Sequence, residues 1–532
     1  MGRRPRVGGG AGHAGCDPGS KMPGRRDAGD PVTSTATPTE LSVRPLLALA
    51  AGRAMALVVT FATPLVLVRV FDQAGFGTYK QLFLIGGTLS VIAQLGMAES
   101  LLYFLPSAPK DGGRYVLNAL LVLGGSGLAC LGLFLALGPL LPRWLGNASL
   151  SGLSRLLGGY VALTLPAAVL EIVLTARKRF GGAGAAYGLS DLVRALAVVA
   201  PAVLTGKLAW LLAGAAAFAA VRLGATLLYL RSEFGAELRP DGALLRKQLA
   251  YALPFQLGGA LWILVLNLHY YLVASFVDAA TFAIYAVGCL QIPLIELLFT
   301  PAKNIMMVRM REAITAHRPG APITIWRDTV GKLAVFFFPL VGLLLVTAHE
   351  LIPFLFTERY AASIPIPIFM IWSTIILIVP LQADGVLGVY ADTRALAVLY
   401  GIQLLLNAGL VTSLIRPFGL VGAVMATALT MGVGKSAILA RAKHHMGATF
   451  AELLPWRRLA ELIGATAASV LVTLEVKAHL SAAPLPLLLV ATAVYVAAYL
   501  GILAVRGVLG AEMVQATTER IRLLLGWAAR AS

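Results

Sequence analysis

Long apolar runs follow one another along most of the chain and are separated by short polar segments. Many of these runs carry few or no charges over about 18 residues or more, enough for an α-helix to cross a hydrocarbon core of roughly 30 Å. A helix satisfies its own backbone hydrogen bonds, which lipid cannot do. We therefore predict an all-α integral membrane protein of about fourteen transmembrane helices. The predicted spans are residues 45–70, 80–105, 115–141, 155–175, 187–206, 208–230, 249–275, 281–302, 332–352, 364–386, 394–415, 419–440, 459–479 and 484–506.

Basic residues alternate with the predicted spans. When the N-terminus is placed in the cytoplasm, most of the 43 Lys and Arg residues fall in cytoplasmic segments, such as Arg177–Arg179 and the loop at 303–332. Cytoplasmic loops carry an excess of Lys and Arg, and one miscounted span would invert every later loop. The charge pattern therefore supports an even number of spans, with both termini in the cytoplasm.

The two ends of the chain differ from the spans. Residues 1–40 are rich in Gly, Pro and Arg and hold no apolar run, which predicts a disordered cytoplasmic tail. Residues 511–532 place Leu524, Leu525 and Trp527 among arginines, which predicts an amphipathic cytoplasmic tail.

A short motif occurs twice, once after the first span and once after the seventh, with the same offset at all four of its positions. The copies are Asp72-x-Ala74-x-Phe76-x-x-Tyr79 and Asp278-x-Ala280-x-Phe282-x-x-Tyr285. Since six spans separate them, both blocks have the same orientation, as in transporters built from parallel repeats. We predict an N-terminal six-helix lobe at 41–235, a C-terminal six-helix lobe at 236–445, and helices 13 and 14 at 446–510 outside the repeat.

Composition excludes several classes of protein. Of the 532 residues, 58% are hydrophobic and 13% are charged, whereas soluble domains average about 25% charged residues. The net charge of +18 lies in loops between spans, so we expect no nucleic acid partner. The cysteines and histidines show no metal-binding spacing and there is no Walker A motif, so we expect neither metal nor cofactor.

Three segments resemble a known family. Arg69–Tyr79 carries a small–phenylalanine–glycine–x–tyrosine pattern after the first span, Gln94–Pro106 resembles the family's second span, and Phe418–Thr427 resembles the start of its twelfth. With fourteen spans and a six-plus-six repeat, residues 41–506 are similar to the multidrug/oligosaccharidyl-lipid/polysaccharide exporter superfamily, in its polysaccharide flippase branch.

The resemblance implies a transporter that moves an undecaprenyl-diphosphate-linked oligosaccharide, such as an O-antigen or exopolysaccharide unit, across the bacterial inner membrane by alternating access. It implies membrane lipids as neighbours, and a polysaccharide polymerase and glycosyltransferases as functional partners. A multidrug or peptidoglycan-precursor exporter of the same superfamily remains an alternative. A membrane glycosyltransferase or polymerase is the alternative of another class, but such enzymes usually carry a long external loop or a soluble catalytic domain. We expect no catalytic residues and no enzymatic activity.

Charged residues inside predicted spans are candidates for function, since a charge at the bilayer centre costs about 2.5–3.5 kcal/mol even on the lenient insertion scale. An arginine pairs with phosphate through a planar fork. We predict that the cargo's diphosphate contacts a set of four basic residues. These are Arg53, Arg222, Arg194 and Lys435.

Each basic residue also has a structural explanation. Lys435 could extend its side chain to the membrane interface. Arg194 could pair with Asp191, three residues away on the same helix face. Arg53 and Arg222 have no acidic residue three or four positions away on their own helices. Either the substrate or a carboxylate on another helix, such as Glu99 or Glu296, would therefore have to balance their charge.

Acidic and other polar residues within the spans have two possible roles. Glu296, Glu99 and Asp191 are candidates for binding a coupling proton or cation, or for pairing with arginines. Glu171 and Asp384 lie near predicted span ends, where we expect them at the membrane interface. For His269 we expect an interhelical hydrogen bond.

Overall fold

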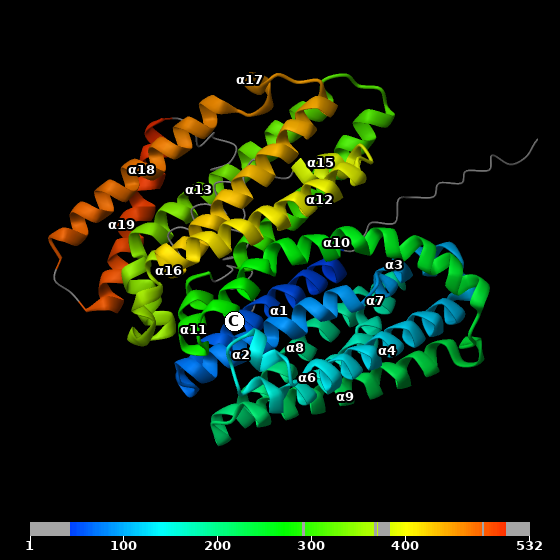
Figure 1. Cartoon of the computed structure of the whole chain (residues 1–532). Coiled ribbons are helices and arrows are strands. Elements are labelled where there is room, and N and C mark those ends of the chain that lie inside the picture. Colours follow the sequence, from blue (N-terminus) through cyan, green and yellow to red (C-terminus); the bar gives the residue numbers. More distant parts are fainter. Residues whose placement is uncertain (1–42, 290–292, 367–369, 371–382, 481–482, 507–532) are drawn as a thin grey trace, which may run out of the picture. The chain divides into compact units, whose positions relative to one another are not determined.

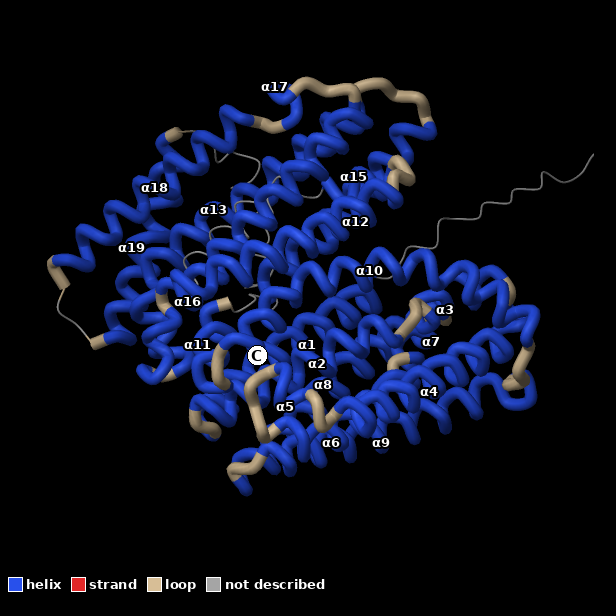
Figure 2. The backbone as a smooth tube through the Cα atoms, in the orientation of Figure 1, coloured by secondary structure: helices blue, strands red, loops and turns tan. Residues whose placement is uncertain are grey.

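The computed structural model describes residues 43–289, 293–366, 370, 383–480 and 483–506 of the chain. Within these residues the chain is helical and contains no strand, as Figure 2 shows. The described residues from Arg44 onward form one compact unit. Both predicted tails and most of the predicted tenth span fall outside the described residues.

The helices are numbered in chain order, and Figure 1 labels most of them. They are α1 (Val43–Val70), α2 (Gln73–Ala93), α3 (Met97–Ser107), η1 (Pro109–Asp111), α4 (Gly112–Leu137), α5 (Leu141–Trp144), α6 (Leu150–Ala167), α7 (Val169–Ala176), α8 (Phe180–Thr205), α9 (Leu208–Phe234), η2 (Gly235–Glu237), α10 (Gly242–Phe276), α11 (Ala279–Gly288), α12 (Pro293–Thr315), α13 (Ala321–Phe356), η3 (Glu358–Ser363), α15 (Ala383–Val389), α16 (Thr393–Met446), α17 (Phe450–Leu453), α18 (Trp456–Ala478) and α19 (Pro484–Val505).

The all-α membrane prediction is confirmed. Among the described residues, ten helices are long and apolar enough to cross a membrane, and Ala54–Val70 and Ala279–Gly288 form shorter apolar helices. The longest of the ten, α16, accounts for two predicted spans, because its backbone leaves the helical region at Gly419 (φ 59°, ψ −141°). A positive φ is readily adopted by glycine. A Cβ placed on Gly422 would lie 2.1 Å from the Leu414 carbonyl oxygen, so the chain folds back tightly there.

The segment predicted as a long cytoplasmic loop at 303–332 is largely helical, and its cytoplasmic side stays a prediction. Helix α12 continues to Thr315 and α13 begins at Ala321, so only residues 316–320 connect them. Both helices continue past their apolar segments, because Lys, Arg and Met are good helix formers in water as well as in lipid.

The two copies of the repeated motif have the same local structure. Asp72 and Asp278 occupy the N-caps of α2 and α11, and their side chains accept hydrogen bonds from the backbone amides of Gly75 and Thr281. The two helices also pack together, and a Cβ on Gly77 would lie 1.8 Å from the Ala279 carbonyl oxygen. The two motifs therefore meet at the predicted external side. The wider division into two six-helix lobes stays a prediction.

The buried apolar residues form three clusters. One joins the predicted external ends of both repeats and includes Phe71 and Phe76 from the first and Phe282, Phe356 and Tyr360 from the second. Towards the predicted cytoplasmic side there are two separate clusters. One lies around α3, α4 and α7 and includes Ala252 of α10, and the other lies around α12, α13, α16 and α18. The described core is thus shared at the external ends, whereas towards the cytoplasmic ends only α10 of the second repeat joins the cluster of the first.

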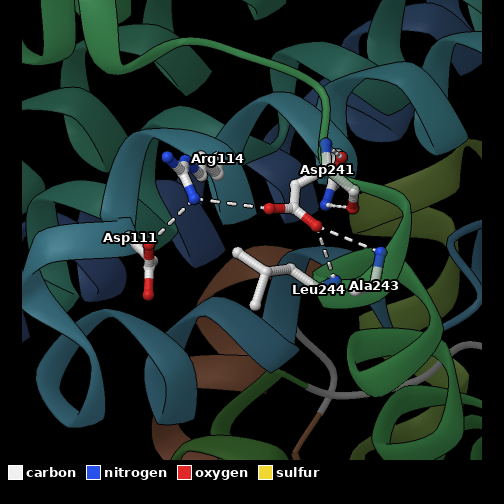
Figure 3. A network of polar contacts seen from close by, with 6 residues as sticks. Asp111, Arg114, Asp241, Ala243 and Leu244 are labelled. Atoms are coloured by element: carbon white, nitrogen blue, oxygen red, sulfur yellow. Dashed lines mark hydrogen bonds and ion pairs between the residues drawn. The ribbon is translucent and has the colours of Figure 1, made fainter.

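Helix α10 is held to α4 at its cytoplasmic end by Asp241. Its carboxylate caps α10 by accepting hydrogen bonds from the amides of Ala243 (3.0 Å) and Leu244 (3.1 Å), and it lies 3.4 Å from the Arg114 guanidinium of α4. Arg114 also lies 3.4 Å from Asp111, as Figure 3 shows. This network anchors the long helix that leads from the first repeat into the second.

Candidate functional site

Arg222 pairs with Glu171 in the first half of the chain. Arg222 lies near the middle of α9, and its Nη2 donates to Glu171 Oε1 on α7. The Glu171 side chain is 3% exposed and that of Arg222 is 19% exposed. Glu171 therefore faces neighbouring helices, and its expected depth at the membrane interface stays a prediction. Although it is close to the end of α7, helices α3, α8 and α9 pack around α7 and enclose it.

The pair leaves part of the Arg222 guanidinium unused. Its Nε is buried and has no hydrogen-bond partner among the described residues. A guanidinium has five N–H donors in a planar fork, so an arginine held by a carboxylate on one edge can still bind an anion on another. The sequence could not identify Glu171 as the partner, because 51 residues separate the two.

Arg194 and Asp191 form the expected salt bridge on one face of α8, with an Nη2–Oδ1 distance of 2.9 Å. Arg194 also donates to the Thr60 hydroxyl of α1 at 3.3 Å. The pair therefore links α8 to α1.

Glu99 lies in the first turn of α3. Its Oε2 is buried and has no hydrogen-bond partner among the described residues. Neither Arg222 nor Arg194 pairs with it, since both use other carboxylates. Glu99 thus has a buried carboxylate oxygen without a partner among the described residues.

Two lysines and one aspartate lie close together in the second half. Lys303 of α12 pairs with Asp384 of α15, and the Asp384 side chain is 12% exposed. Lys435 of α16 is 6% exposed, and its ammonium lies 4.5 Å from the centre of the Trp262 ring on α10. We call Lys303, Asp384, Lys435 and Trp262 the lysine cluster.

The lysine cluster bears on two expectations. Lys435 is buried over an aromatic ring, so it does not extend to the membrane interface. Asp384 is enclosed and paired with Lys303, and its expected depth at the membrane interface stays a prediction. Lys303 was missed, because the sequence placed it at the start of a cytoplasmic loop. With two lysines and one carboxylate, the cluster has a formal net charge of +1.

His269 forms the expected interhelical hydrogen bond. Its Nδ1 lies 2.6 Å from the Tyr285 hydroxyl of α11, and both residues are buried. This contact joins α10 to α11.

The remaining two candidates are Arg53 on α1 and Glu296 on α12. The side chains of both lie outside the described residues. Their predicted roles stay predictions.

Polar contacts connect the two repeats at their predicted external ends. Arg69 at the end of α1 donates to the carbonyl oxygens of Phe354 and Leu355 at the end of α13, each at 2.9 Å. Gln73 of α2 donates to the Arg359 carbonyl oxygen in η3 at 2.6 Å. We call these hydrogen bonds the external contacts. They lie on the side where the apolar core is shared.

Comparison with known proteins identifies the family of this chain. The family described as "Polysaccharide biosynthesis protein" matches residues 66–365. The chain belongs to this family. The matched region runs from the end of α1 to the start of the segment after η3 and contains both copies of the repeated motif. No curated protein sequence matches the chain.

Solved structures of membrane transporters share the fold. The lipid II flippase MurJ, in an inward closed conformation, has a TM-score of 0.66 at 10% identity, covering 88% of this chain and 99% of that chain. A multidrug resistance MATE family transporter of the MOP superfamily, inward-facing, has a TM-score of 0.57 at 14% identity, covering 76% and 98%. A MOP superfamily transporter from Pyrococcus furiosus has a TM-score of 0.55 at 12% identity, covering 76% and 95%. The polysaccharide biosynthesis chain is therefore a multi-pass membrane protein with a transporter fold.

Proposed function

We propose that the protein moves an undecaprenyl-diphosphate-linked oligosaccharide, an O-antigen or exopolysaccharide repeat unit, from the inner to the outer leaflet of the bacterial inner membrane. The observation that carries the proposal is that a polysaccharide biosynthesis family chain has a transporter fold. Polysaccharide units assembled on a lipid in the cytoplasm must cross the membrane before they reach the cell surface. The protein would carry out this step without changing a covalent bond.

The distribution of core and contacts supports alternating access. The two repeats share an apolar core and the external contacts at one side. At the other side their cores are separate except for α10, which packs against the first repeat through Ala252 and Asp241. By the predicted topology the shared side is external, so this arrangement would receive cargo from the cytoplasm. Release outside would require the external contacts to break.

The basic residues suit a diphosphate. Arg222 keeps an unpaired edge beside Glu171, and the lysine cluster has a formal net charge of +1. We propose that Arg53, Arg194, Arg222 and Lys435 contact the diphosphate as it passes, and that each half supplies part of the charge. Guanidinium groups pair with phosphate in a bidentate manner, whereas lysine acts as a point charge.

Movement of charged cargo would need an energy source. Glu99 has a buried carboxylate oxygen without a described partner, and we propose it as the first candidate for binding a coupling proton or cation. Glu296 is the second candidate. Asp191 is less suited, because Arg194 already holds its carboxylate.

The similarity in fold to a lipid II flippase favours one other candidate function, export of a peptidoglycan precursor. Both cargoes would present a lipid diphosphate, so the same basic residues would serve.

A deletion strain distinguishes the two functions. If the proposal is correct, loss of the gene removes surface polysaccharide, and lipid-linked oligosaccharide accumulates facing the cytoplasm while cell-wall synthesis continues. Loss of cell-wall synthesis with normal surface polysaccharide would favour the precursor exporter. In the same strain, the Arg53→Ala variant tests whether Arg53 takes part in transport.

A further inference from the structure

The backbone is strained where α13 ends. Thr357, the residue directly after α13, has φ 73° and ψ 160°. Among the described residues, five that are not glycine have a positive φ, and Thr357 has the largest. Sterics make this region of φ and ψ accessible essentially to glycine alone, and a β-branched residue such as threonine is a true outlier there.

Neither the side chain of Thr357 nor the end of α13 explains this conformation. The Thr357 Oγ1 is buried and has no hydrogen-bond partner among the described residues. The Thr357 amide donates to the Pro353 carbonyl oxygen at 2.8 Å, a bond that closes the last turn of α13 and does not require a positive φ. A strained residue persists only where the surrounding structure fixes it, so the cause lies in what packs around this turn.

The first repeat holds the chain on both sides of Thr357. Before it, Arg69 donates to two carbonyl oxygens at the end of α13, each at 2.9 Å. After it, Gln73 donates to a carbonyl oxygen of η3 at 2.6 Å. The buried Tyr360 ring of η3 also meets the Phe76 ring of α2, with 5.9 Å between the ring centres. The strained turn is therefore fixed by contacts that join the two repeats.

We propose that the strain at Thr357 is stored while the external contacts are made, and that it favours opening of the external side. This inference rests on the proposed function, in which those contacts break to release cargo. When Arg69 and Gln73 no longer bind the two flanking segments, Thr357 can return to an ordinary backbone conformation. The strain therefore opposes the contacts that close the external side, and it keeps the closed arrangement from becoming too stable to open.

Thr357→Gly tests the proposal, because a glycine adopts the same turn without strain. Strain of this kind shifts a two-state equilibrium about tenfold, so the ratio of externally open to externally closed molecules should fall about tenfold. Ala361→Gly is the matched control, since it places a glycine in the adjoining η3 at a residue without a positive φ. Thr357→Ala, which loses the hydroxyl but keeps a Cβ, should lower the ratio less.

The ratio is measured from the distance between spin labels on Lys207→Cys and Arg416→Cys. Both residues are exposed, and they lie at the predicted external ends of the first and second repeats. Cys16→Ser removes the native cysteine outside the described residues, and the remaining native cysteines, Cys130 and Cys289, are buried. Double electron–electron resonance on the full chain then gives the populations of short and long distances, and it requires no cargo.

Each variant is measured alone and together with Arg69→Ala, which removes two of the external contacts and should raise the open population. In that background Thr357→Gly should again lower the ratio, so the result does not depend on a large open population in the native protein. Movement of a fluorescent lipid-linked oligosaccharide by the native protein is measured separately. Failure of the proposed function is thereby distinguished from failure of this inference.

Three results would overturn the inference. An unchanged or higher ratio in Thr357→Gly would mean that the strain persists in both arrangements. An equal fall in Ala361→Gly would assign the effect to backbone freedom near the turn rather than to strain. A short distance alone in every variant, including those with Arg69→Ala, would mean that the external contacts do not open.

Discussion

The Glu171→Ala substitution tests whether the pair between α7 and α9 is buried. It leaves the Arg222 guanidinium near the middle of α9 without its carboxylate, in a place where Glu171 itself is 3% exposed and Arg222 is 19% exposed. Removing one partner of a buried ion pair costs about 3–5 kcal/mol. Because Arg222 keeps some exposure, we expect a loss of about 3 kcal/mol in the free energy of unfolding.

A double variant separates the structural role of the pair from a role in transport. Glu171→Leu combined with Arg222→Met replaces both charges with apolar side chains, and such replacements are often neutral or stabilising. We expect its free energy of unfolding to lie within about 1 kcal/mol of the native value. We expect polysaccharide export to be lost, because the guanidinium that would contact the diphosphate is gone.

The assays are thermal or denaturant unfolding of the purified protein in detergent, and surface polysaccharide in a strain that lacks the native gene. If Glu171→Ala were as stable as the native protein, the pair would not be buried as described. If the double variant were stable and exported polysaccharide normally, Arg222 would have no part in binding cargo.

Three further predictions concern topology, the first helix and a helix cap. A reporter fused near Arg318 should report the cytoplasm and one within 350–363 the outside; the reverse would overturn every depth assigned here. Arg53→Ala should abolish export with normal protein in the membrane, and Arg53→Lys should restore part of it; normal export by Arg53→Ala would refute its role. Asp278→Ala should cost about 1 kcal/mol of stability by removing an N-cap. The hydrogen bond from the Thr281 amide lowers the pKa of Asp278. The stability that the Asp278 cap contributes should therefore be complete above the ordinary carboxyl pKa and decline as the pH falls. Unfolding of the native protein and of Asp278→Ala, measured as a function of pH, checks this.

The positions of the spans could be predicted, because hydropathy is a local property of sequence. Each predicted span except the tenth coincides with a described helix or pair of helices. The repeat of the Asp72 and Asp278 motifs was also visible in the sequence, whereas the N-cap role of both aspartates came from the structure. The end of α12 could not be predicted from hydropathy, because a helix ends where its backbone hydrogen bonds end, and that point need not coincide with the edge of the apolar segment.

The partners of the buried charges could not be predicted. Glu171 and Asp384 are close to helix ends, and only packing by distant helices makes them buried. Arg222 and Lys303 meet carboxylates 51 and 81 residues away. By contrast, Asp191 and Arg194 pair within one helix, which is why spacing alone predicted their salt bridge.

Transport by the purified protein tests the central claim most directly. The full chain would be reconstituted into liposomes with a fluorescent undecaprenyl-diphosphate-linked oligosaccharide, and movement between leaflets followed by a quencher that cannot cross the bilayer. The account predicts that the native protein speeds this movement and that the stable Glu171→Leu, Arg222→Met variant does not. Native protein that leaves this lipid in its original leaflet, while moving lipid II or a multidrug substrate in the same liposomes, would contradict it.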